Sequence, residues 1–139
     1  MRIVLDTNVL IAAALKGGLS EQILRLSTSR DLTLIVSEEI IKELTEKLLT
    51  KFAWKEDEAS LYIRTVRESA EIVTPSTKVD LVKDPDDNKI LEAALEGKAE
   101  LIVSIDQDLI KLKSFSGIGI VHPKTLTWIL PKLFEKARY

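Results

Sequence analysis

The 139-residue sequence contains no cysteine, and this absence excludes several kinds of chemistry at once. Without thiols the chain can form no disulfide, no thiolate zinc site and no cysteine nucleophile. It has a single histidine, His122, which cannot by itself form a histidine-rich metal site. We expect His122, which stands before a proline at the start of a helix, to be structural.

Long apolar runs and an excess of basic residues are also missing. No run approaches the roughly 20 apolar residues that span a bilayer, and Asp6 interrupts the first apolar stretch too early for a signal peptide. We therefore expect a cytoplasmic protein with no membrane partner. The net charge is −2, from 20 basic and 22 acidic residues. Binding to nucleic acid would therefore have to rely on metal ions or local basic patches.

The composition, 45% hydrophobic and 30% charged, is typical of a folded domain. Short apolar runs indicate strands at residues 2–5, 32–36, 72–73, 101–105 and 117–121. Helical patterns lie between them, at residues 9–15, 20–27, 38–51, 56–71, 85–96, 106–108 and 124–136. We expect Ser20 to cap the second helix, Leu61, Ile63 and Val66 to lie on the buried face of the fourth, and Pro131 to kink the last.

Nearly apolar strands that alternate with helices are typical of a parallel sheet covered on both faces. We predict one α/β domain over residues 1–139. It is a three-layer sandwich, with a central, mostly parallel, twisted sheet of about four to five strands flanked by helices.

Two of the predicted strands end in an acid, Asp6 and Asp106. Ligands of open parallel sheets bind at the carboxyl ends of the strands, so both carboxylates would meet at one edge if the strands are neighbours. Each acid could equally be a helix cap, as aspartate often is. For either residue alone, both interpretations stay open.

Asp87 lies on an apolar helical stripe, three, four and seven residues before Ile90, Leu91 and Ala94. An ionised carboxylate facing a sheet is costly unless it is paired or binds a metal. The alternative is a capping arrangement, with Asp84 at the N-cap, Pro85 at the first helical position and Asp87 at the third. It explains the presence of Asp84 well, but that of Asp87 only in part.

Glu43 falls beside the buried stripe of its helix, which Ile40, Ile41, Leu44 and Leu48 form. From this position its side chain could reach over the sheet edge. A glutamate at such a rim is more often an ordinary solvated residue.

Four segments together resemble the PIN-domain family, and more narrowly its VapC-like toxins. They are Leu5-Asp6-Thr7-Asn8-Val9-Leu10, Ser37-x-x-Ile40-x-x-Glu43, residues 84–94 (DPDDNKILEAA) and residues 103–109 (VSIDQDL). The resemblance places the family's acidic quartet on Asp6, Glu43, Asp87 and Asp106. Asn8 and Ser104 match supporting polar positions, and Asp108 matches an additional acid.

The resemblance implies a metal-dependent nuclease, a hydrolase that cuts single-stranded RNA with Mg²⁺ or Mn²⁺ and leaves a 5′-phosphate. Hard divalent ions suit a site of carboxylates without His or Cys. Asp6, Asp87 and Asp106 would be the metal ligands, and Glu43 would orient the attacking water or a second ion. The resemblance further implies the toxin of a toxin–antitoxin pair, a homodimer or higher oligomer neutralised by a small antitoxin.

Three alternatives stay open: an RNA-processing nuclease, a catalytically silent PIN scaffold, and a phospho-acceptor signalling domain. The complete acidic quartet counts against a silent scaffold. A phospho-acceptor domain needs an acid after its third strand, where this chain has Thr74-Pro75. Phe52, Trp54 and Tyr62 could stack on bases, although a role in the core or in a subunit contact is the more common one.

Overall fold

The computed structural model describes residues 1–136, so residues 137–139 of the predicted domain lie outside it. The strands are β1 (Arg2–Leu5), β2 (Thr33–Ser37), β3 (Ala70–Val73), β4 (Leu101–Val103), β5 (Ser114–Phe115) and β6 (Ile118–Val121). The helices are α1 (Thr7–Leu15), α2 (Gly18–Leu26), α3 (Glu38–Thr50), α4 (Glu56–Ser69), α5 (Pro85–Glu96), α6 (Gln107–Ile110), α7 (Pro123–Ile129) and α8 (Pro131–Lys136).

The strands form one sheet in the order β3-β2-β1-β4-β6-β5. All neighbouring pairs are parallel except β5 and β6. In the centre of the sheet, Val4 of β1 is paired with Ile35 on one side and with Ile102 on the other. The predicted mostly parallel sheet is confirmed, with its first strand in the middle.

The sheet has six strands where four to five were expected. The additional strand, β5, has two residues and forms a hairpin with β6, in which Phe115 is paired with Ile118. Ser116 and Gly117 both have positive φ, 49° and 78°. Two such residues form the turn that matches the twist of a hairpin. A two-residue strand has too few positions for an alternating pattern, which is why the sequence did not indicate it.

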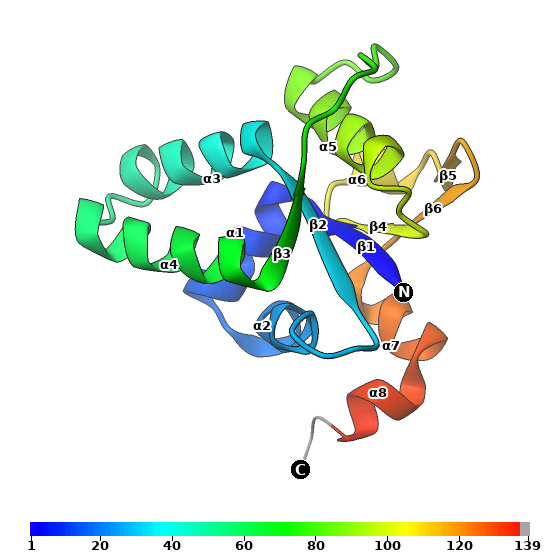
Figure 1. Cartoon of the computed structure of the whole chain (residues 1–139), viewed down its shortest axis with the longest axis horizontal. Helices are drawn as coiled ribbons and strands as arrows, with labels where there is room; N and C mark the ends of the chain where they lie inside the picture. The colour runs from blue at the N-terminus through cyan, green and yellow to red at the C-terminus, as the bar shows by residue number, and fades with distance from the viewer. Residues whose placement is uncertain (137–139) are drawn as a thin grey trace.

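Helices cover both faces of the sheet. In Figure 1, α5 lies on one side, against β1, β2 and β4, whereas α1, α2 and α7 lie together on the opposite side. Helices α3 and α4 form a pair that extends away from the sheet, towards the left of the view. The residues of β1 between these layers, Ile3, Val4 and Leu5, are fully buried. This arrangement is the predicted three-layer sandwich.

The carboxyl end of helix α5 lies close to the sheet, because its C-cap residue is Gly97. A Cβ atom at this position would come within 2.5 Å of the Ile35 side chain in β2. Glycine therefore lets the end of α5 reach the sheet, and this contact helps to set the position of the whole helix.

Three local predictions are wrong. Helix α2 begins at Gly18 after Gly17, which has no side chain to cap it, rather than at Ser20. Leu61 is 65% exposed, because Ala59, Tyr62 and Val66, at positions i, i+3 and i+7, form the inner face of α4. Pro131 starts α8 instead of kinking one helix, and Leu130 before it leaves the helical conformation, as residues before proline tend to do.

Phe52, Trp54 and Tyr62 pack against the core, with the rings of Trp54 and Tyr62 edge to face at 6.1 Å. His122 is the N-cap of α7, where its Nδ1 accepts a hydrogen bond from the backbone N–H of Lys124 at 3.1 Å. Both are structural roles. No helix within residues 1–136 is long and apolar enough to cross a membrane.

Candidate active site

A small pocket of about 40 Å³ lies at the carboxyl end of the sheet, where α1, α3 and α5 meet β1 and the segment after β4. The structure brings the four predicted catalytic acids together there, although the first and the last, Asp6 and Asp106, are 100 positions apart in the sequence. The pocket is lined by Asp6, Thr7, Asn8, Glu43, Lys47, Asp84, Asp86, Asp87, Ile90 and Asp106.

Asp6 is both a helix cap and a member of this pocket. It follows β1 directly, and its backbone N–H donates to Val103 O of β4 at 3.0 Å. Its Oδ1 accepts from the backbone N–H of Val9 at 2.9 Å, and its Oδ2 accepts from the Ser104 hydroxyl. The side chain is 3% exposed, and this burial raises its pKa, although the bonds from Ser104 and Val9 oppose the rise. The carboxylate is therefore buried and fixed in orientation.

Ser104 connects the ends of the two central strands. Its fully buried hydroxyl donates to Asp6 and accepts from the backbone N–H of Asp106 at 2.9 Å. One side chain thus sets the positions of two predicted metal ligands. This is the kind of support that ligands of a metal site usually have.

Asp87 lies in the first turn of α5, on the stripe with Ile90, Leu91 and Ala94 that the sequence predicted to be buried. Asp84 is the N-cap of this helix and accepts from the backbone N–H of Asp86 at 2.9 Å. Asp87 is 9% exposed. Burial, followed by the nearby Asp106 carboxylate, raises its pKa to about 7. Because capping is the role of Asp84, it does not account for the buried Asp87.

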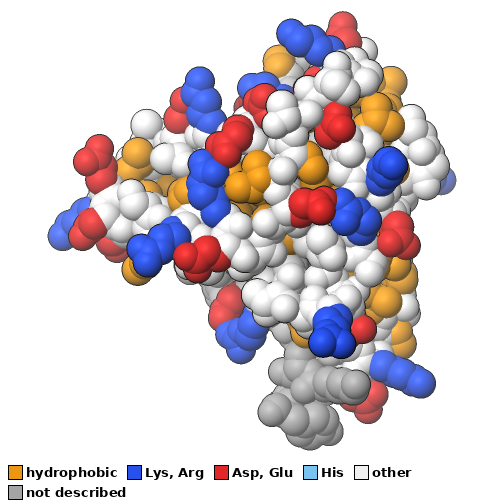
Figure 2. Space-filling view, viewed as in Figure 1, with side chains coloured by type: hydrophobic (Ala, Val, Ile, Leu, Met, Phe, Trp, Pro, Cys, Tyr) orange, Lys and Arg blue, Asp and Glu red, His pale blue; other side chains and the backbone are white. Residues whose placement is uncertain are grey.

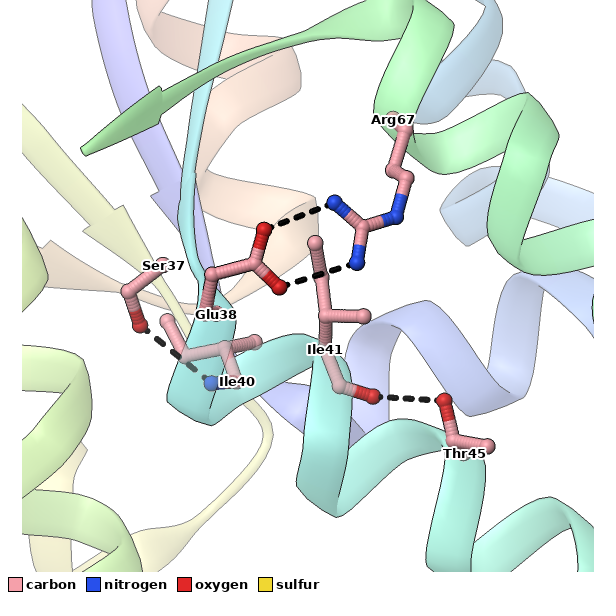
Figure 3. Close-up of polar contacts among 6 residues, drawn as sticks. All are labelled: Ser37, Glu38, Ile40, Ile41, Thr45 and Arg67. Carbon is pink, nitrogen blue, oxygen red and sulfur yellow. Dashed lines mark hydrogen bonds and ion pairs between the residues drawn. The ribbon is translucent and has the colours of Figure 1, made fainter. Parts of the chain in front are cut away.

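Glu43 is carried by α3, and the start of this helix is held firmly. Figure 3 shows the Ser37 hydroxyl accepting from the backbone N–H of Ile40 at 3.2 Å. It also shows Arg67 of α4 donating two hydrogen bonds, at 2.7 and 2.9 Å, to the carboxylate of Glu38. The Ser37 cap therefore fixes where α3 begins, and the Arg67–Glu38 pair joins α3 to α4.

One and a half turns further along α3, the Glu43 side chain is 12% exposed, and its Oε1 lies 3.1 Å from Nζ of Lys47. Burial raises the pKa of Glu43, and Lys47 opposes the rise. The prediction that Glu43 reaches the sheet edge agrees with its place in the pocket lining.

The donor set of the pocket fits a hard divalent cation. Six acidic side chains line it, and Lys47 is the one basic side chain among the lining residues that the structure describes. Carboxylates so close together raise one another's pKa until a cation balances them. Within residues 1–136, no three Asp, Glu or His side chains already form a ready set of ligands. The acids line one pocket, but their carboxylates do not form a complete set of metal ligands in the protein alone.

The predicted supporting residues divide into two groups. Asn8, although exposed, lines the pocket, and Ser104 lies beneath it as described. Asp108 does not line the pocket; its carboxylate lies 3.7 Å from Lys111 in solvent, and only its backbone N–H contacts Asp106, at 2.9 Å.

Thr7 and Lys47 also line the pocket, and sequence reasoning missed both. Lys47 could have been found from its spacing, because a residue four positions after Glu43 lies on the same helix face. Thr7 gave no such signal, since a threonine at the first position of a helix is ordinary.

One face of the molecule offers little to attract nucleic acid. On the face shown in Figure 2, acidic and basic side chains are interspersed, with no broad basic patch. Any attraction for phosphate on this face must therefore be local.

Comparisons with known proteins bear on the family and the fold of the chain. A family model described as PIN domain matches residues 2–108. The uncharacterized protein MJ1680 of Methanocaldococcus jannaschii is 31% identical, over 96% of this chain and 89% of that protein. The fold is similar to the crystal structure of VapBC2 from Rickettsia felis bound to a DNA fragment from their promoter. The TM-score is 0.65 at 19% identity, over 86% of this chain and 97% of that one.

Proposed function

The chain belongs to the PIN domain family, and on this premise we propose that it is a Mg²⁺- or Mn²⁺-dependent endoribonuclease. PIN domains are generally nucleases that use divalent metals. One observation in this molecule carries the proposal. Six acids line a single small pocket at the carboxyl end of the sheet, where Lys47 alone among the described lining residues can balance their charge.

Each acid has a role that its position supports. Asp6, Asp87 and Asp106 come from three different elements around the pocket and would hold the ion. Glu43, on the fourth, would orient the attacking water. Ser104 keeps Asp6 and Asp106 in register by bonding to both. When bound, the ion would neutralise the scissile phosphate, lower the pKa of the attacking water and stabilise the departing oxyanion.

The balance of charge also explains how an acidic protein could cut RNA. With a net charge of −2, the chain does not attract phosphate as a whole. Divalent ions bound to the pocket carboxylates would remove the negative charge there, so the pocket could attract phosphate while the rest of the surface stays the same. The substrate would then be held at the pocket, and single-stranded RNA is the substrate we propose.

We further propose that the cellular role is that of a toxin neutralised by a small antitoxin, with the toxin acting as a homodimer. The support is similarity of fold to VapBC2 of Rickettsia felis, whose structure was determined with promoter DNA. Growth arrest on expression of the wild type, but not of Asp6→Asn, would support this role. Cleavage without growth arrest would favour an RNA-processing nuclease instead.

The test of the enzymatic proposal is cleavage of single-stranded RNA with Mn²⁺ or Mg²⁺, by wild type, Asp6→Asn and Asp87→Asn. Asparagine keeps the shape of aspartate, and at the N-cap position of Asp6 it also caps helices, so both variants should fold. We expect each to cut at least about 100-fold more slowly, and a chelator to abolish cutting by the wild type. Glu46→Gln, an exposed acid on α3, is the control and should cut normally. Equal cutting by all proteins would point to a contaminant and contradict the proposal.

A further inference from the structure

Thr7 carries a buried hydroxyl group with no hydrogen-bond partner. The residue is 3% exposed and lines the pocket. Among the buried side-chain nitrogen and oxygen atoms that the structure describes, Thr7 Oγ1 is the one without a partner. Other buried hydroxyls are bonded; that of Ser27, for example, donates to Ile23 O at 3.0 Å. Such an exception in a native fold requires an explanation.

The position of Thr7 in its helix explains why the usual partner is missing. A threonine inside a helix can donate to the carbonyl of the preceding turn, as Thr45 does to Ile41 O at 2.8 Å (Figure 3). Thr7 is the first residue of α1, so no helical turn precedes it. The adjacent Asp6 is not its partner either: the two oxygens of Asp6 accept hydrogen bonds from Val9 and Ser104, and neither accepts one from Thr7. The hydroxyl therefore has no partner within its own helix.

Glu43 is the acid next to this hydroxyl. Both residues line the same pocket, and the Thr7 hydroxyl lowers the pKa of Glu43, although the two groups do not meet the geometry of a hydrogen bond. On its other side Glu43 is paired with Lys47 at 3.1 Å. The pocket thus presents a carboxylate and an unpartnered hydroxyl side by side, a pair that can hold one small polar molecule between them.

We propose that Thr7 is a positioning residue whose hydroxyl oxygen accepts one hydrogen of the attacking water while Glu43 accepts the other. This inference rests on the proposed nuclease function. With both hydrogens held, a lone pair of the water is left to face the phosphorus atom. The arrangement gives Thr7 a hydrogen bond only when the pocket is filled, which accounts for its missing partner in the protein alone.

The test compares Thr7→Val, which replaces the hydroxyl by a methyl group, with Thr7→Ser, which keeps it. In a chelator, Thr7→Val should unfold at the same temperature as wild type or higher, because no bond is lost. With Mn²⁺, kcat for single-stranded RNA should fall about ten-fold, KM should stay within two-fold, and the Mn²⁺-induced rise in unfolding temperature should remain. Thr7→Ser should recover most of kcat.

Thr45→Val is the matched control. It loses a real hydrogen bond and should unfold at a lower temperature, with kcat unchanged. If Thr7→Val also unfolds earlier in the chelator, or if its kcat equals that of wild type, the proposal is overturned. Asp6→Asn separates this failure from that of the nuclease function. If wild type cuts no better than Asp6→Asn, the function itself is wrong, and the role of Thr7 with it.

Discussion

Two of the four glutamates of helix α3, Glu38 and Glu43, lie five residues apart and are in opposite situations. Glu38 is exposed at the start of the helix and accepts two hydrogen bonds from Arg67, which lower its pKa (Figure 3). Glu43 lies in the pocket, paired with a single lysine, and its burial raises its pKa. One carboxylate is more easily ionised than in water and the other less easily.

The difference separates a structural charge from a functional one. The Glu38–Arg67 pair is complete within the protein and joins α3 to α4 at the surface, where such a pair contributes little to stability. Glu43 belongs to a group in which negative charge is in excess, so the fold alone does not satisfy it. An acid that the fold leaves unsatisfied is a candidate for binding something the fold does not contain.

The largest expected effect comes from exchanging each glutamate for glutamine. Glu43→Gln should reduce the rate of RNA cleavage by at least about 100-fold, because the amide cannot accept a proton from the attacking water. Glu38→Gln should cut within two-fold of wild type and lower the unfolding temperature by about 3 °C or less. Cleavage assays and thermal unfolding of both variants measure the two effects. Equal loss of cleavage in the two variants would show that Glu43 and Glu38 do not differ in function.

A smaller effect is expected for the two serines that are fully buried at the ends of β2 and β4, Ser37 and Ser104. Ser104→Ala should weaken Mn²⁺ binding about 10- to 100-fold, since it frees Asp6 and Asp106 from their shared partner. Ser37→Ala removes the cap of α3, which should cost about 1 kcal/mol of stability and leave Mn²⁺ affinity nearly unchanged. Calorimetric titration with Mn²⁺ distinguishes them. If Ser104→Ala binds Mn²⁺ as wild type does, Ser104 does not support the site.

The smallest effect is on stability as a function of pH without metal. The pKa of Asp87 is about 7 in the folded chain against an ordinary 3.8, so between these values the folded chain keeps a proton that the unfolded chain has lost. Stability should therefore fall as pH rises towards 7 and level off above it. Asp6 and Glu43, whose pKa values are also raised, act in the same direction. Glu38 and Glu96, with lowered pKa values, act oppositely, but only below about pH 5.

Measuring the unfolding temperature between pH 5.5 and 7.5 detects the effect of the pocket acids alone, because Glu38 and Glu96 act at lower pH. In a chelator, the unfolding temperature should fall by several degrees over this range, and Mn²⁺ should reverse the fall. In Asp87→Asn the slope should be much smaller. If the unfolding temperature of the wild type rises with pH instead, the pKa values of the pocket acids are not raised in the folded chain, and the prediction is wrong.

The sequence predicts the parts of this molecule that depend on local chemistry. Asp84 followed by Pro85 indicates a helix start, the apolar spacing after Asp87 indicates its buried face, and Ser37 indicates the cap of α3. The two predictions for α5 agree with the structure, and Ser37 caps α3 where the helical pattern was expected to begin. The convergence of Asp6 and Asp106 could be predicted only on the condition that β1 and β4 are neighbours, and the sheet order meets this condition.

What the sequence does not predict depends on contacts between distant elements. Leu61 looks apolar enough to be buried, yet the face of α4 that packs is chosen by where α3 lies. The unpartnered hydroxyl of Thr7 cannot be inferred from sequence, because it depends on where the neighbouring elements place their acceptors. The partnership of Ser104 with two acids likewise requires both strand ends to be in place.

The hydrogen bond between Ser104 and Asp6 spans 98 positions of the chain. During synthesis the ribosome adds Asp6 long before Ser104, so this carboxylate cannot acquire its partner until the segment after β4 has emerged. A nascent chain that stops before residue 104 holds at most three of the four acids and lacks the side chain that aligns Asp6 with Asp106. The order of translation thus delays assembly of the pocket, so that a nuclease made beside messenger RNA would lack its site until the segment after β4 has been synthesised.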